Sequence, residues 1–141
     1  MIQATALRPY DARMWCAMAG CFKLLGRKQE AIQCYKRAES NDDREGIALQ
    51  ELARLFDAEG DERQAAHYYA EMLKQRESHG EMVGQETQDA LLFLANHCKD
   101  SGALEEAQQY CSRLLDFGGH EKEEAKALLR DIRSQFSKQT R

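Results

Sequence analysis

The sequence contains one proline and no long run of apolar residues. Proline interrupts helices, and the abundant Ala, Leu, Glu, Gln, Lys and Arg favour helix over strand. No stretch approaches the ~20 apolar residues that a membrane-spanning helix needs. Residues 1–7 have neither a basic segment nor a long apolar run, so no signal peptide is predicted. We therefore expect an all-α chain that has no membrane partner.

The chain also lacks an excess of basic residues. Its 20 Lys and Arg residues are outnumbered by 24 Asp and Glu residues, which gives a formal net charge of -4. Neutralising phosphates requires a basic surface, so no nucleic-acid partner is expected. The five cysteines are an odd number and fall within helical patterns. This favours free thiols in a reducing compartment, and we expect the protein in the nucleus and cytoplasm.

A pattern of eight positions occurs three times. A large apolar residue is followed by an apolar residue three positions on, a small one four on and a bulky or sulfur-containing one seven on. A glycine comes eleven on and an alanine sixteen on. This spacing is the signature of the TPR repeat, a helix pair of about 34 residues. The copies are Trp15, Met18, Ala19, Phe22, Gly26, Ala31, Tyr35 and Ala38; Leu49, Leu52, Ala53, Phe56, Gly60, Ala65, Tyr69 and Met72; and Leu91, Leu94, Ala95, Cys98, Gly102, Ala107, Cys111 and Leu114.

The spacing has a physical cause. The first four positions lie on one face of a helix, because a helix brings residues three, four and seven apart onto the same side. In the first copy, Gly26 is placed to end that helix and Ala31 to let the second helix approach closely. A plain helical bundle has amphipathic helices too, but no reason to repeat eight positions at one spacing. The sequence predicts an all-α, TPR-type superhelix, a right-handed solenoid of antiparallel helix pairs.

The repeats also divide the chain. Ala4 precedes Ala38 by 34 residues, so the start resembles the end of a preceding repeat. The third copy is late, because 42 residues separate Ala65 from Ala107, and the glycines in between favour a loop. Gly118 and Gly119 are expected to stop the last paired helix. We predict the end of a truncated repeat at 1–10, TPR repeats at 12–45, 46–79 and 88–119, an insertion loop at 80–87 and a capping helix at 120–141.

Cys98 and Cys111 occupy facing positions of the third copy beside His97, which raises a metal or redox hypothesis. Zinc is bound by about four ligands at characteristic spacings, and none of these occurs here. The same two positions carry aromatic residues in the other copies, so cysteine is more simply a small core residue. No Ser/His/Asp set and no phosphate-binding loop is found. We expect no catalytic site, no metal and no cofactor, and therefore no enzyme.

The concave face of the first helices is the candidate binding surface. Side chains that point away from the paired helix could hold an extended or helical peptide through hydrogen bonds and charge pairs. The simpler interpretation is that they are ordinary solvated residues. The candidates are Arg13 and Lys23 in the first copy, Gln50, Arg54 and Asp57 in the second, and Leu92, Asn96 and Lys99 in the third, with Cys16 and Gly20 on the same face.

One specific use of this groove can be tested on the sequence. Chaperone-adaptor TPR domains hold a peptide's terminal carboxylate with a set of Lys, Asn, Asn, Lys and Arg. None of these is matched here, and the acidic residues would repel a carboxylate. The corresponding positions are Cys16, Gly20, Glu51, Asp89 and Phe93.

Several stretches resemble one family more closely than generic repeat positions require. They are similar to the C-terminal TPR region of the subunit-eight family of scaffold proteins of the anaphase-promoting complex (cyclosome). The most specific are Leu7-Arg8-Pro9-Tyr10-Asp11 and Lys126-Ala127-Leu128-Leu129-Arg130, and the likeness extends over 7–15, 30–38, 47–55, 65–69, 110–116 and 126–132.

The resemblance implies a non-catalytic subunit of a ubiquitin ligase that drives mitosis. It implies other subunits of that complex, and its substrate-recruiting coactivator, as partners. The family homodimerises through N-terminal repeats, so that interface is not expected in this chain. A stand-alone TPR adaptor that binds a peptide in its groove is the alternative.

Overall fold

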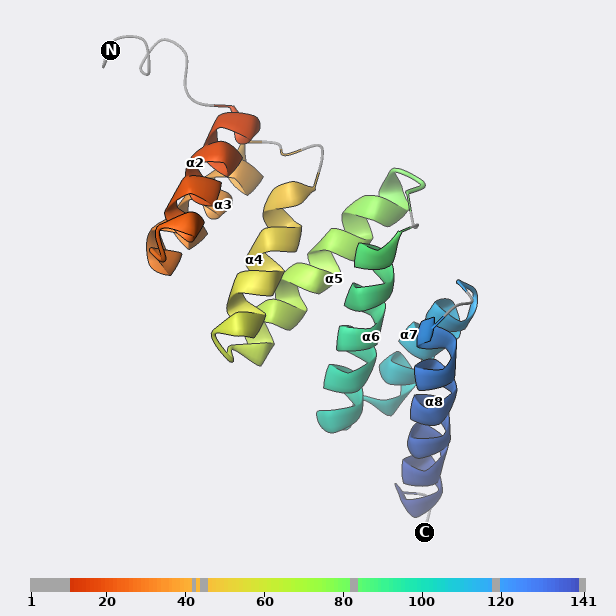
Figure 1. Ribbon diagram of the computed structural model, residues 1–141. Helices are drawn as coiled ribbons and strands as arrows, with labels where there is room; N and C mark the ends of the chain where they lie inside the picture. The colour runs from red at the N-terminus through yellow and green to blue at the C-terminus, as the bar shows by residue number, and fades with distance from the viewer. Residues whose placement is uncertain (1–10, 42, 44–45, 82–83, 118–119, 140–141) are drawn as a thin grey trace, which may run out of the picture. The chain divides into compact units, whose positions relative to one another are not determined.

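The computed structural model describes residues 11–41, 43, 46–81, 84–117 and 120–139 (Figure 1). Every regular element in these ranges is an α-helix, and the chain forms two compact units, Met1–Tyr68 and Tyr69–Arg141. None of the described helices is long and apolar enough to cross a membrane. The predicted repeat end at 1–10 and the stop at Gly118 and Gly119 lie outside the described residues. The helices are α2 (Ala12–Leu24), α3 (Lys28–Ser40), α4 (Ile47–Ala58), α5 (Glu62–Ser78), α6 (Gln85–Asp100), α7 (Leu104–Leu115) and α8 (His120–Gln139).

The first unit begins with the antiparallel pair α2 and α3, which lie side by side in Figure 1. The Asp11 carboxylate accepts a hydrogen bond from the Met14 backbone N–H at 2.9 Å and caps the start of α2. Gly26 ends this helix with φ 77°, and the Arg27 N–H donates to the Phe22 carbonyl at 2.9 Å. Ala19 and Ala31 are fully buried in one core. The predicted roles of Gly26 and Ala31 are confirmed.

The helix α4 packs against α3 within the same unit. Its Ala48, Leu52 and Leu55 are buried in the core that the first helix pair forms. The Phe56 ring stacks on Tyr68 of α5 with 5.6 Å between centroids. The helix α4 therefore extends the core of the first helix pair.

The second unit contains the end of α5 together with α6, α7 and α8. The rings of Tyr69 on α5 and Phe93 on α6 lie 4.8 Å apart. Ala95 and Ala107 are fully buried where α6 meets α7. The helix α8 packs on both and buries Leu128, Leu129 and Ile132 in their core. In the described residues, α8 therefore covers the apolar side of the third helix pair.

The predicted loop over 80–87 extends too far, because α6 already begins at Gln85. The interval between helices is six residues both at 41–46 and at 79–84. The eight extra residues lengthen the helices instead: α5 has 17 residues against 13 in α3, and α6 has 16 against 12 in α4.

The glycines in this region end helices and do not build a longer loop. Gly80 has φ 68°, and the N–H of Glu81 donates to the Arg76 carbonyl at 2.8 Å, which closes α5. The two added turns also contact each other, since Arg76 Nη1 donates to the hydroxyl of the fully buried Thr87 at 2.8 Å. This contact gives the added turns a hydrogen bond of their own.

Candidate functional site

Three charged side chains meet between α2 and α4, on the face that the sequence predicts to bind a partner. Lys23 Nζ lies 2.8 Å from Glu51 Oε2, and Arg54 Nη1 lies 3.4 Å from Glu51 Oε1. Lys23 comes from the last turn of α2, whereas Glu51 and Arg54 are three residues apart on α4. The structure thus joins two predicted site residues through one carboxylate, and we call these three residues the charged cluster.

The surroundings of the charged cluster are partly buried and partly open. Tyr35 of α3 is buried, and burial, the nearby Glu51 carboxylate and the Cys16 and Cys34 thiols raise its pKa to about 12. Gly20 lies one turn before Lys23, and a Cβ built on it would meet no described atom within 4 Å beyond its chain neighbours and the adjacent backbone of α2. The cluster therefore has a buried tyrosine on one side and open space over α2 on the other.

The other predicted residues of the first unit lie outside this cluster. Arg13 is exposed at the start of α2, with Nη2 3.9 Å from the Asp11 carboxylate. Gln50 is half-buried and Asp57 is exposed on α4. Lys23 and Arg54, by contrast, share a partner in the Glu51 carboxylate.

The predicted residues of the second unit are used largely within it. Lys99 is mostly buried and lies 3.9 Å from the Asp131 carboxylate of α8. The Asn96 amide donates to the Leu92 carbonyl of its own helix at 3.0 Å, and Leu92 itself is half-buried. These three side chains contribute to packing and are less available to a partner than Lys23 and Arg54.

The expectation that Glu51 repels a carboxylate needs correction. Its charge is balanced by Lys23 and Arg54, so two cations accompany one anion at this point. Asp89 accepts a hydrogen bond from Gln85 at 2.9 Å, and the Phe93 ring packs on Tyr69. Neither of the latter positions offers a donor to a carboxylate.

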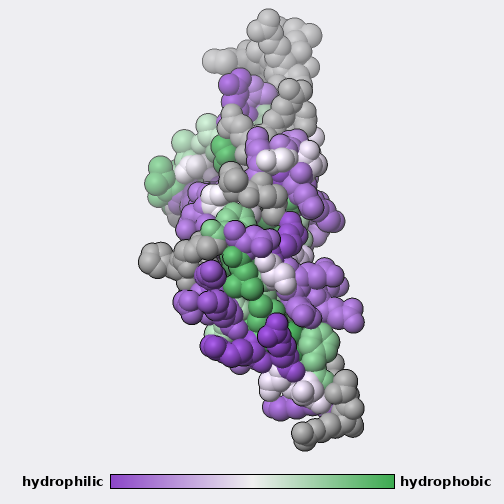
Figure 2. Space-filling view, turned by 90° about the vertical axis from the view of Figure 1, so that its right-hand side faces the viewer, coloured by the Kyte–Doolittle hydropathy of each residue, from purple (hydrophilic) through white to green (hydrophobic). Residues whose placement is uncertain are grey.

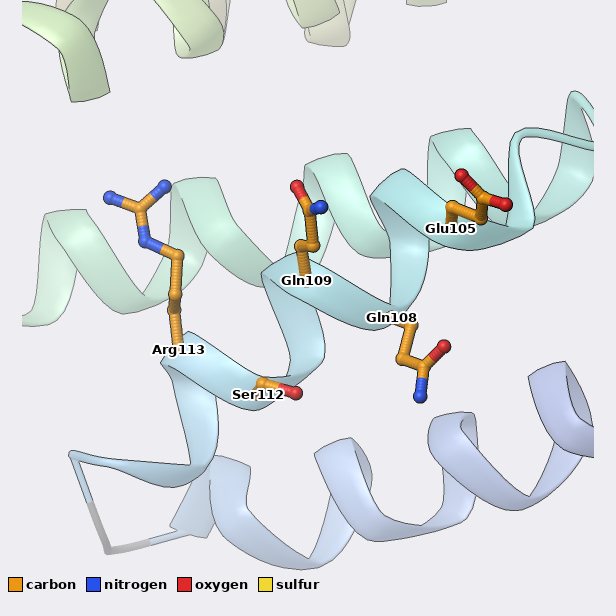
Figure 3. A pocket seen from close by; sticks show the side chains of 5 residues that line it. All are labelled: Glu105, Gln108, Gln109, Ser112 and Arg113. Atoms are coloured by element: carbon orange, nitrogen blue, oxygen red, sulfur yellow. The ribbon is translucent and has the colours of Figure 1, made fainter.

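A second surface, which the sequence did not reveal, is a shallow hollow of about 650 Å³ on the outer face of α7. Figure 3 shows Glu105, Gln109 and Arg113 extending to one side of the helix and Gln108 to the other. Arg113 also lies 3.8 Å from Glu77 of α5. The other lining residues follow Glu105 by three, four, seven and eight positions, a helical spacing that is a detectable signal of such a polar face. The residues that line the hollow are Glu105, Gln108, Gln109, Ser112 and Arg113.

Apolar side chains are also exposed on α2, although the face in Figure 2 is mostly hydrophilic. Leu24 is 91% exposed, and Leu25 and Met14 are also exposed. One repeat later, the position of Met14 is occupied by Ala48, which is buried in the core formed with α3. Exposed apolar residues of this kind favour contact with another protein surface.

Cys98 and Cys111 do not form a reactive pair. Cys98 and Cys111 are buried, and the Cys98 thiol contacts the Glu106 carboxylate at 3.8 Å. Burial and Glu106 raise the pKa of Cys98, and burial raises that of Cys111 to about 11. Both are therefore protonated at neutral pH, and the thiol is a poor nucleophile. No group of three or more His, Cys, Asp or Glu in the described ranges is placed to hold a metal ion.

Comparison with known proteins defines the class first. No protein-family model matches the chain. A solved structure, the first TPR of Spaghetti (RPAP3) bound to HSP90 peptide SRMEEVD, superposes with a TM-score of 0.59 over 89% of this chain and 95% of that one. The two are 18% identical, so the likeness concerns the fold alone. The chain has an all-α, TPR-type helical repeat fold, as predicted.

The sequence then identifies particular relatives. The chain is 49% identical over 105 residues to anaphase-promoting complex subunit 8 of Arabidopsis thaliana, covering 74% of this chain. It is 50% identical over 108 residues to the subunit of the same name of Dictyostelium discoideum, covering 77%. The chain spans 18% of the length of each relative. The resemblance to anaphase-promoting complex subunit 8 is confirmed over three quarters of the chain.

Proposed function

We propose that the chain is a non-catalytic interaction module of the anaphase-promoting complex, a ubiquitin ligase of the cell cycle, in which it acts as part of a TPR scaffold subunit. The observation that carries this proposal is the identity of about one half with subunit 8 over three quarters of the chain. The TPR-type fold supports it, because stacked helix pairs present extended surfaces for protein partners. The buried, protonated thiols support a role without catalysis.

The partners that follow from the proposal are other subunits of the complex, together with its coactivator. We also propose that the chain acts in the nucleus and cytoplasm, because free thiols favour a reducing compartment. Within the first unit, Lys23 and Arg54 are the best placed of the predicted groove residues, because both are half-exposed and lie within 3.4 Å of a shared partner. Arg13, Gln50 and Asp57 extend this surface along α2 and α4.

Affinity capture from cell extract tests the proposal. The tagged 141-residue chain is the bait, and the first TPR of Spaghetti is the control bait, since it shares the fold at 18% identity. We expect subunits of the anaphase-promoting complex with this chain and not with the control. Recovery of none of those subunits, or of one unrelated peptide-bearing partner, would contradict the proposal.

A stand-alone peptide adaptor is the second candidate, because the structural neighbour is bound to an HSP90 peptide. The residue types at Cys16, Gly20, Glu51, Asp89 and Phe93 argue against the same peptide here, since they lack the donors that hold a carboxylate. Calorimetric titration with SRMEEVD distinguishes the two candidates. We expect no tight binding of this peptide to the wild-type chain, whereas tight binding would favour the adaptor.

A further inference from the structure

We propose that Lys23 and Arg54 form the receiving site for an acidic side chain of a partner peptide, and that Glu51, which lies beneath them, weakens this site by competing for the same cations. This inference rests on the proposed function, because it assumes that the face of α2 and α4 binds a protein. It adds the chemistry of the partner, an aspartate or glutamate, and an internal competitor for the same cations.

The first argument is the geometry of the held carboxylate. The two oxygens of Glu51 are divided between two cations, with Oε2 at 2.8 Å from Lys23 and Oε1 at 3.4 Å from Arg54. The first distance is that of a charge-assisted hydrogen bond, whereas the second exceeds the ~2.7–2.9 Å of a full one. Arg54 therefore retains donor capacity that a second carboxylate can use.

The second argument is access. The side chains of Lys23 and Arg54 are each 46% exposed, whereas that of Glu51 is 14% exposed. The cations thus face solvent, and the carboxylate lies beneath them. A partner can reach both cations without opening the helix pair.

The third argument is the open space beside the cluster. Gly20 is in the interior of α2, where glycine is less favourable for the helix than alanine. Apart from its chain neighbours and the adjacent backbone of α2, no atom of the described residues lies within 4 Å of a Cβ built on it, so packing does not require a glycine here. A glycine one turn from Lys23 lets a partner backbone approach α2 closely enough to direct a carboxylate at the cations.

The fourth argument is the sign of the charge. Two cations and one carboxylate leave an excess of one positive charge at the cluster, in a chain whose formal net charge is -4. The neighbouring pair, Lys28 with Glu59 at 3.4 Å, is balanced. Asp57, three residues beyond Arg54, is exposed and outside the cluster. A carboxylate is therefore the group that gains most at this point.

The test uses two matched probes, N-acetyl-Ala-Glu-Ala amide and its glutamine counterpart, titrated into the ¹⁵N-labelled full chain. The decisive variant is Glu51→Gln, which keeps the side-chain shape and removes the competitor. We expect the glutamate probe at millimolar concentration to shift the Gly20 and Lys23 amides saturably, with affinity about tenfold higher in Glu51→Gln than in the wild type. Lys23→Ala combined with Arg54→Ala should abolish the shifts.

Glu59→Gln is the control, because it removes a charge from the separate Lys28 pair and should leave the probe affinity unchanged. Absence of glutamate-specific shifts in a folded Glu51→Gln protein overturns the inference, as does equal binding of the glutamine probe. The affinity capture described above is independent of this result. If the ligase subunits are recovered but the titration fails, only the inference of a receiving site is overturned. If both experiments fail, the proposed function is overturned as well.

Discussion

Lys23 of α2 and Glu51 of α4 form an ion pair of 2.8 Å although 28 residues separate them in the sequence. The pair joins the first helices of two successive helix pairs. The Glu51 carboxylate also contacts a second cation, Arg54. It lies close enough to the buried Tyr35 to raise the pKa of that phenol. One carboxylate thereby links two half-exposed cations to the packing beneath them.

Replacing Ala31 by leucine should destabilise the protein by about 1–3 kcal/mol, because the added methylene groups overpack a fully buried site. Chemical denaturation followed by circular dichroism measures the change. Gln29→Leu, at an exposed position of the same helix, is the control and should change stability little. An unchanged free energy of unfolding in Ala31→Leu would mean that the helix crossing is not at this alanine.

Glu51→Gln should lower the pKa of Tyr35, because the glutamate charge disfavours the phenolate beside it. The value should stay above the ordinary 10.0, since burial is the larger cause. A pH titration of ¹³C-labelled tyrosine by NMR gives the value, and Glu59→Gln should leave it at about 12. A pKa that does not move would place Glu51 too far from the phenol to act on it.

Stability should fall at high pH because of Cys111. Its pKa is about 11 in the fold and 9.0 ordinarily, so the folded state holds the proton more tightly. The resulting stability is complete below pH 9 and is lost as the pH rises through about 11. Denaturant midpoints between these values measure the loss, and Cys111→Ala should show a smaller one. An equal decline in both proteins would assign the effect to other groups.

Thiol reactivity should separate the cysteines. Cys21 is exposed, whereas Cys34, Cys98 and Cys111 are buried with raised pKa values. We expect rapid modification of Cys21 by a disulfide reagent at pH 8, and much slower modification of the other three until the protein is unfolded. Mass spectrometry of the digested protein identifies the sites. Fast labelling of Cys111 in the native protein would contradict the packing of α7 against α8.

Removal of residues 120–141 should expose the apolar face that α8 covers and promote aggregation. Light scattering after size-exclusion chromatography detects this. The matched variant is Arg130→Ala on the exposed side of α8, which should remain monomeric. A truncated chain that stays monomeric and as stable as the parent would refute the covering role.

The sequence predicted what the repeat determines and missed what depends on contacts between repeats. The small residues Ala19 and Ala31 and the turn at Gly26 follow from local spacing, so their positions could be read directly. The pairing of Glu51 with Lys23 requires the packing of one helix pair on the next, which no periodic pattern specifies. The internal use of Lys99 was missed for the same reason, because its partner Asp131 is on α8, outside the repeat.

The eight extra residues between the second and third repeats are shared equally by two helices, and this affects which changes in helix length the fold can accept. Each of α5 and α6 gains four residues, close to the 3.6 of one helical turn. Four added residues change the angular phase along a helix by only about 40°, so Tyr69 and Leu91 keep their orientation toward the core. Insertions or deletions of about one turn where α5 ends and α6 begins should therefore be tolerated. A change of two residues would instead rotate the core-facing side of the helix by roughly half a circle.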